Sequence, residues 1–405
     1  MGYFKRLYLL VVLSICAFEV NGQNNFEYWQ QRVDYKMDVK MDVGSHTYTG
    51  TQNLIYTNNS PDDLDVVFYH LYYNAFQPGS EMDIRSITIS DPDSRVDDRI
   101  SMLKKEDYGF INVLSLTQGG DPINFNVAGT VLEVKLGVPI KSGSSTELKM
   151  VFEGQVPPVI RRAGKNSSEG VALSMAQWYP KMAEYDFEGW HADPYIGREF
   201  HGVWGDFDVK LSIDKNYTVG GTGYLQNPEE VGHGYGEKIT KYDSDLITWH
   251  FIAPDVHDFT WAADPNFTHD TIAVPNGPVL HFLYKTSLGE GYKKSWRKLQ
   301  PMASEIIQHY SNSIGKYPYE QYSIIQGGDG GMEYGMCTLI TGERKFESLV
   351  GVTAHEIGHS WFQFLLASNE SKHPWLDEGF AEYTCTFIEN SLLGKENSDP
   401  FRAAY

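Results

Sequence analysis

Apolar and polar residues alternate along much of the first two thirds of the chain. This period-two pattern is typical of strands that are buried on one face only. Clusters of Asn, Ser, Gly and Pro separate the alternating segments and mark turns. The pattern therefore predicts a largely antiparallel N-terminal β domain over residues 23–268. Its alternating segments are residues 35–43, 131–136, 148–152, 207–213 and 247–252.

Beyond residue 268 the apolar period changes to that of a helix. Apolar residues recur every three or four positions between Trp296 and Ile314. Residues 322–326 predict a short strand, and residues 347–367 and 377–392 predict two further helices. Residues 269–405 are therefore expected to form an α+β domain. The predicted fold class is multidomain, an antiparallel β domain followed by an α+β domain.

The N-terminus has the layout of a secretory signal peptide. Lys5 and Arg6 precede an apolar run over residues 7–18, and a small residue, Gly22, offers a cleavage point. We expect residues 1–22 to be removed and the protein to be secreted, or to reside in the periplasm or cell envelope. A lipid anchor at Cys16 is the weaker alternative, because Ile15 is bulky where a lipobox has a small residue.

Composition narrows the range of partners. The chain has 33 Lys and Arg against 53 Asp and Glu, a net charge of −20. Nucleic acid is held by clustered basic residues, so it is not expected as a partner. After the signal peptide, no apolar segment reaches the roughly 20 residues that a membrane-spanning helix needs. Cys337 and Cys385 are left to pair or to stay free, and the oligomeric state is open.

The strongest chemical signal is an H-E-x-x-H motif, His355-Glu356-Ile357-Gly358-His359. Four residues make about one helical turn, so both imidazoles lie on one helix face and are able to hold one Zn²⁺ ion. Zinc lowers the pKa of a water at its open position, and Glu356 is placed to take that proton as general base.

Glu378 is the expected third ligand. It lies nineteen residues after His359, within the string Trp375-Leu376-Asp377-Glu378-Gly379. A second helix would bring its carboxylate to the metal and complete a His2Glu set with an open position for water. The competing interpretation is an exposed glutamate in the first turn of a helix.

A third string, Gly330-Gly331-Met332-Glu333-Tyr334, precedes the motif. Glycines allow the backbone of a substrate to approach closely, and a neighbouring carboxylate is able to bind a free α-amine. Composition alone favours a loop with an exposed glutamate. A phosphate-binding loop is not expected, because no Gly-Lys-Ser/Thr follows.

Together the three strings resemble the M1 family of zinc aminopeptidases, which are gluzincins related to aminopeptidase N and leukotriene A4 hydrolase. The resemblance implies a thermolysin-like catalytic domain over residues 269–405 and peptides with a free N-terminus as substrates. It assigns zinc binding to His355, His359 and Glu378, catalysis to Glu356 and amine binding to Glu333. It also implies that Gly330 and Gly331 line the substrate, and more loosely that Gln177 shapes the first subsite.

Two departures from the family pattern bear on activity. Tyr334 stands where the family has Asn. The tyrosine that stabilises the oxyanion in the family has no counterpart, because Tyr383 lies too close to Glu378 and Tyr405 also comes too early. The catalytic domain is therefore expected to be incomplete. Loss of one oxyanion donor typically lowers kcat by about 10²–10³, so we expect slow hydrolysis.

Two other functions remain open at this point. A thermolysin-like endopeptidase would share the zinc ligands and Glu356 but would not need Glu333. A non-catalytic secreted zinc-binding protein would fit the lack of an oxyanion tyrosine, although the presence of Glu356 opposes it.

Overall fold

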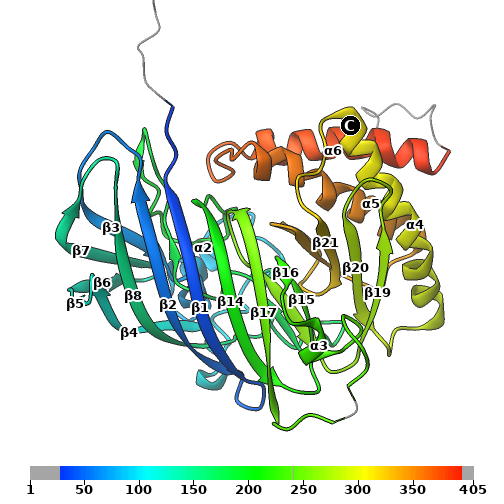
Figure 1. Cartoon of the computed structure of the whole chain (residues 1–405), viewed down its shortest axis with the longest axis horizontal. Coiled ribbons are helices and arrows are strands. Elements are labelled where there is room, and N and C mark those ends of the chain that lie inside the picture. Colours follow the sequence, from blue (N-terminus) through cyan, green and yellow to red (C-terminus); the bar gives the residue numbers. More distant parts are fainter. Residues whose placement is uncertain (1–27, 240, 395–405) are drawn as a thin grey trace, which may run out of the picture.

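The computed structural model describes residues 28–239 and 241–394. The signal peptide predicted for residues 1–22 lies outside this range, as does Tyr405. Figure 1 shows a broad curved sheet on one side and a smaller sheet with long helices on the other. The order predicted from the sequence, β then α+β, is thus confirmed.

The largest sheet has eight strands, and its two sides differ in polarity. In β1 the residues Val33, Tyr35, Met37, Val39 and Met41 are buried while most of their neighbours are not, as predicted. The strands, in spatial order, are β16 (Tyr224–Leu225), β17 (Leu246–Val256), β14 (Trp204–Asp214), β1 (Arg32–Asp42), β2 (Thr47–Asn58), β8 (Ser144–Gln155), β4 (Phe110–Gln118) and β5 (Asp121–Pro122).

The pairing of β1 with β14 departs from the antiparallel pattern. The two strands run parallel over nine residue pairs, from Arg32 with Trp204 to Lys40 with Ser212. Parallel neighbours need a long connection between them, and the whole of residues 43–203 supplies it. Alternation of apolar and polar residues does not report strand direction, so this parallel pairing could not be predicted.

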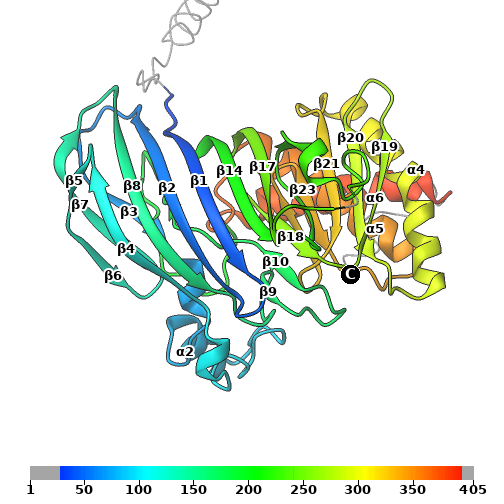
Figure 2. The same ribbon diagram turned by 60° about the horizontal axis from the view of Figure 1, so that its bottom comes forward.

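Smaller sheets and short helices complete the β-rich part. Figure 2 shows β10 and β18 between the large sheet and the second unit. One sheet contains β15 (Thr218–Gly221), β18 (Trp261–Asp264), β10 (Leu173–Met175) and β9 (Gly164–Lys165). Another contains β11 (Lys181–Met182), β3 (Leu64–His70), β7 (Val131–Ile140) and β6 (Phe125–Ala128), and β12 (Tyr185–Asp186) pairs with β13 (Gly189–Trp190). The short helices are η1 (Tyr72–Ala75), α2 (Glu81–Thr88), η2 (Lys105–Asp107) and α3 (Pro228–Val231).

Buried aromatic side chains join these sheets. Trp178 makes edge-to-face contacts with Tyr48 of β2 and Trp261 of β18, at ring-centroid distances of 6.1 and 6.2 Å. Its indole N–H donates to the carbonyl of Phe259, so burial leaves no polar atom of this side chain unsatisfied. The segment that carries Gln177 is therefore anchored in the core.

The second unit is built on a mixed five-stranded sheet. Its order is β19 (Phe267–Ala273), β20 (Val279–Lys285), β21 (Gln321–Gln326), β23 (Cys337–Ile340) and β22 (Gly331–Tyr334). β21 corresponds to the predicted strand. β22 runs antiparallel to β23 and forms the edge of the sheet. The domain boundary predicted at residue 268 falls at the start of β19 and stays a prediction.

Three helices form a second apolar core with this sheet; the first two pack against the sheet, and the third packs on them. They are α4 (Glu290–Ser313), α5 (Phe346–Gly358) and α6 (Pro374–Leu392). The apolar positions of α4, from Trp296 to Tyr310, are buried as their spacing predicted. No helix in the described ranges is both long and apolar enough to cross a membrane.

The single helix predicted for residues 347–367 is wrong in its second half. α5 ends at Gly358, and a distorted π-helical turn, η3 (Ser360–Leu365), follows. Phe362 and Gln363 have non-helical backbone angles, and φ of Gln363 is +95°. The carbonyl of Phe364 accepts the backbone N–H of Ala367 and also lies 2.9 Å from the Nε2 atom of His257. The spacing of apolar residues did not reveal this break, because Trp361 and Phe364 are buried here just as a continuous helix would require.

Candidate metal centre

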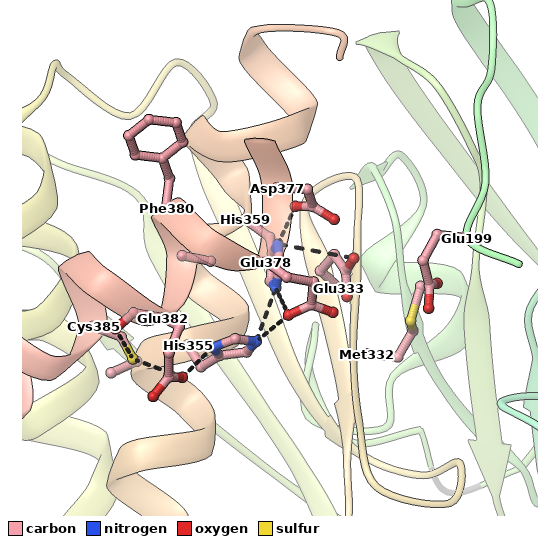
Figure 3. A network of polar contacts seen from close by, with 12 residues as sticks. Glu199, Met332, Glu333, His355, His359, Asp377, Glu378, Phe380, Glu382 and Cys385 are labelled. Atoms are coloured by element: carbon pink, nitrogen blue, oxygen red, sulfur yellow. Dashed lines mark hydrogen bonds and ion pairs between the residues drawn. The ribbon is translucent and has the colours of Figure 1, made fainter. Parts of the chain in front are cut away.

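The end of α5 and the start of α6 bring His355, His359 and Glu378 together (Figure 3). The Nε2 atoms of the two histidines are 3.0 Å apart. Oε2 of Glu378 lies 3.1 Å from Nε2 of His355 and 3.8 Å from Nε2 of His359. All three predicted ligands thus direct donor atoms at one point.

This donor set fits zinc. Zinc is bound by imidazole and carboxylate groups at about 2.0–2.2 Å, which places neighbouring donors of a tetrahedron about 3.4 Å apart. The three observed separations, from 3.0 to 3.8 Å, bracket that value. The charge of the site also favours a cation. Burial alone would lower the pKa of His359, but Glu333 and Asp377 outweigh it and raise this pKa to about 10.

The helix positions these side chains through close packing. Gly358, between the two histidines, faces Tyr310 of α4, and a Cβ there would lie 2.5 Å from the tyrosine hydroxyl oxygen. That hydroxyl donates to the carbonyl of Ala354. Only glycine allows this approach of α4, which supports the turn that carries both histidines.

Two further carboxylates contact the histidines from behind. Asp377 Oδ1 lies 2.5 Å from Nδ1 of His359, and both side chains are fully buried. Glu382 Oε2 lies 3.3 Å from Nδ1 of His355, but this contact lacks the direction of a hydrogen bond, so only Asp377 orients its histidine. An outer carboxylate fixes the ring orientation and raises the basicity of the ligating nitrogen. Glu382 follows Glu378 by one helical turn, so its spacing in the sequence could have indicated that it lies near the metal ligands. For Asp377 the only such sign is its position next to Glu378.

We expect Asp377→Ala to weaken zinc binding by about 10–100-fold, because loss of an outer partner of a metal ligand typically has that effect. Competition with a chromophoric chelator measures the change. Glu305→Ala removes an exposed carboxylate of α4 and is the control. Equal zinc affinity in both variants would contradict an orienting role for Asp377.

Glu356 lies between the metal ligands and β22. Its side chain is buried, and Oε2 has no hydrogen-bond partner among the described residues. Burial raises its pKa, although His359 and His355 oppose the shift. A Cβ on Gly331 would stand 2.0 Å from Oε1 of Glu356, so only glycine fits there. Gly330 has open space at the same position, so packing does not require it.

Glu333 projects from β22 toward the same centre. Its Oε1 atom lies 3.9 Å from Nδ1 of His359, and its side chain is buried. Oxygens of Glu333, Glu370 and Asp377 also lie within 4.8 Å of one another. Burial, together with Glu356 and Asp377, raises the pKa of Glu333 well above its usual range. Glu370 was not anticipated, since it lies in a polar loop segment without a motif.

Gln177 lies near Tyr334, the residue that follows Glu333. It is buried and has a positive φ of +51°, but neither its Nε2 atom nor the nearby hydroxyl of Tyr334 has a hydrogen bond to any described residue. A non-glycine residue with positive φ costs conformational energy and is enriched at functional sites. Arg162 contacts Met332, the residue before Glu333, and Glu199. It was not expected from the sequence. The sequence offers no pattern that would have indicated Arg162.

Cys337 and Cys385, whose pairing the sequence left open, are both free and buried.

Comparisons with known proteins agree with this geometry. No family model matches the sequence. Over 114 residues the chain is 31% identical to leucine aminopeptidase 2-1 of Meyerozyma guilliermondii, a match that covers 26% of this chain and 17% of that protein. Over 101 residues it is 32% identical to leukotriene A-4 hydrolase of Xenopus laevis, which covers 23% of this chain and 16% of that protein.

Solved structures match over far more of the chain. The M1 zinc metallopeptidase of Deinococcus radiodurans superimposes with a TM-score of 0.56 at 14% identity, over 93% of this chain and 74% of that one. A mutant of that enzyme bound to a Tyr-Ser-Ala substrate gives a TM-score of 0.57 at 15% identity, over 93% and 73% of the two chains.

The chain has the fold of the M1 zinc metallopeptidases, and its cluster of His355, His359 and Glu378 fits a zinc ion. The resemblance to the M1 family predicted from its sequence is thus confirmed. The segments matched to the two named relatives span less than a fifth of the length of either.

Proposed function

We propose that the chain acts as a zinc-dependent aminopeptidase that removes the N-terminal residue from peptides. The observation that carries this proposal is the position of Glu333. Its carboxyl group is buried 3.9 Å from a histidine of the metal cluster, close to the reacting atoms, and its raised pKa means that a neighbouring cation is needed to favour the ionised form. A free α-ammonium would pair with it and place the first peptide bond beside Glu356.

His355, His359 and Glu378 would hold the zinc ion, which supplies a Lewis acid that polarises the carbonyl and makes water easier to deprotonate. Glu356 accepts the proton of the attacking water and returns it to the leaving amine. Its burial and raised pKa suit a group that must gain and lose a proton during the reaction.

Substrate alignment is proposed to use the edge strand β22. An edge strand has unpaired backbone groups, to which an extended peptide is able to add as a further strand. β22 begins at Gly331, and its Glu333 side chain is directed to the metal centre. Gly330 and Gly331 leave room for the substrate backbone at the point where it would enter.

We expect Glu333→Gln to lower kcat/KM for a peptide with a free N-terminus by about 10- to 150-fold. A hydrogen bond to a charged group contributes about 1.5–3 kcal/mol, and the amide removes the charge. The same peptide with an acetylated N-terminus should be a poor substrate for both proteins. Equal cleavage of the free and acetylated peptides by the unmodified chain would favour the endopeptidase alternative.

Slow hydrolysis and export stay predictions. Hydrolysis above background that a chelator removes would exclude the non-catalytic alternative. A full family-like rate would contradict the expectation of slow turnover.

The prediction of export rests on residues 1–22 alone, and N-terminal sequencing of the protein made in its own host would test cleavage after Gly22.

A further inference from the structure

We propose a second metal site, formed by Asp186, His191 and His201, for a divalent transition-metal ion such as Zn²⁺. Asp186 ends β12, and His191 follows β13 directly, so one short hairpin holds both. His201 comes from the segment that precedes β14. The site lies outside the zinc centre described above and shares no residue with it.

The donor atoms are close enough to share one ion. Oδ2 of Asp186 lies 2.8 Å from Nε2 of His191 and 3.9 Å from Nε2 of His201. These distances bracket the separation of about 3.4 Å expected between donors of a tetrahedral zinc ion. Two imidazoles and a carboxylate are a donor set that borderline divalent metals such as zinc prefer.

The arrangement reproduces that of the first centre. The rings of His191 and His201 have centroids 5.0 Å apart and an interplanar angle of 86°. The corresponding values for His355 and His359 are 4.7 Å and 81°. In the first centre the carboxylate lies 3.1 and 3.8 Å from the two imidazole nitrogens, close to the 2.8 and 3.9 Å found here.

The facing nitrogens lack hydrogen-bond partners. Nε2 of His191 and Nε2 of His201 are buried, and neither has a hydrogen bond to any described residue. The 2.8 Å contact between His191 and Asp186 therefore does not have the direction of a hydrogen bond. His191 itself is only 7% exposed. Oδ1 of Asp186 accepts the backbone N–H of Glu188, which leaves Oδ2 for the histidines.

An ion has a route to this site. Asp186 and His201 line a cavity of about 620 Å³, whose walls include Trp29, Tyr185 and Trp204. The cavity gives access from solvent and room for a water molecule at a fourth coordination position. An entry path is one of the features expected of a metal site.

The site also contacts the catalytic unit. Nδ1 of His191 lies 3.3 Å from Nδ2 of Asn369, the neighbour of Glu370. As placed, the amide donates to Nδ1, so the ring proton is on Nε2. Metal binding at Nε2 moves the proton to Nδ1 and requires Asn369 to turn its oxygen toward the ring. The Asn369 oxygen would then lose the hydrogen bond that it accepts from the hydroxyl of Ser371.

The test counts zinc in the 405-residue chain by mass spectrometry after dialysis. Two ions per chain are expected in the unmodified protein, and one in each of His355→Ala, His201→Ala and Asp186→Asn. His309→Ala, which changes a histidine of α4, should keep two. One ion in the unmodified protein, or two in both His201→Ala and Asp186→Asn, would overturn the proposal.

A zinc titration in the His355→Ala background isolates the second site. Adding His201→Ala or Asp186→Asn should weaken the remaining site by at least about 100-fold, more than the loss of an outer partner causes. Asn369→Asp should tighten it by about 10-fold, because a carboxylate accepts the Nδ1 proton. Circular dichroism identifies any variant that has not folded. If His201→Ala does not fold, the zinc affinity of Asp186→Asn, whose side chain keeps the same shape, tests the assignment. Unchanged affinity in the folded variants would contradict the assignment.

Discussion

Glu356→Gln should lower kcat by at least about 100-fold while leaving zinc bound. The carboxylate is buried beside both histidine ligands, and one of its oxygens has no hydrogen-bond partner among the described residues. Glutamine has the same shape but cannot accept the proton of the attacking water. General-base catalysis typically contributes about 10²–10⁴-fold, and the loss should fall in that range.

Single-turnover hydrolysis and metal analysis of the same sample measure the two parts of this expectation. Glu305→Gln makes the same chemical change at an exposed position of α4 and should alter neither value. Loss of zinc from Glu356→Gln would show that Glu356 supports the ligands instead of acting as the base.

Gly331→Ala should reduce activity by a similar factor, although it adds only one methyl group. The new Cβ would stand 2.0 Å from Oε1 of Glu356 and 2.8 Å from Cγ2 of Val352. Either the Glu356 carboxylate or β22 must move to relieve this overlap. A displacement of about 1 Å is able to cost about 10²-fold in rate, because the reacting groups lose their alignment.

Gly291→Ala is the matched control for this variant, since Gly291 is exposed in α4 and nothing lies within 4 Å of a Cβ there. Both proteins should bind zinc, and only Gly331→Ala should lose most of its kcat. Comparable kcat values in the two variants would contradict the steric argument and indicate that the Glu356 carboxylate has room to move.

The metal ligands were predictable because helical geometry links sequence spacing to position. His355 and His359 lie one turn apart, and the apolar pattern indicated that α5 and α6 are helices. The alternating strands were predictable for a similar reason, since one face of β1 or β14 is buried while the other is largely exposed in β1 and half-buried in β14.

What escaped prediction depends on contacts between distant segments. The parallel pairing of β1 with β14 and the break after Gly358 leave no mark on local periodicity. Asp186, His191 and His201 have no motif spacing, because a hairpin and an irregular segment bring them together. Glu370 meets Glu333 only through the folded loop.

The central position of β1 in the eight-stranded sheet constrains how the chain folds. β2 follows β1 directly and is able to pair with it early. The other edge of β1 stays unpaired until β14 has been synthesised, because β14 follows residues 43–203 in the chain. During synthesis that edge offers unpaired backbone groups, which favour wrong association. Folding of the β-rich part should therefore be slow, and β14 and β17 are expected to join it last.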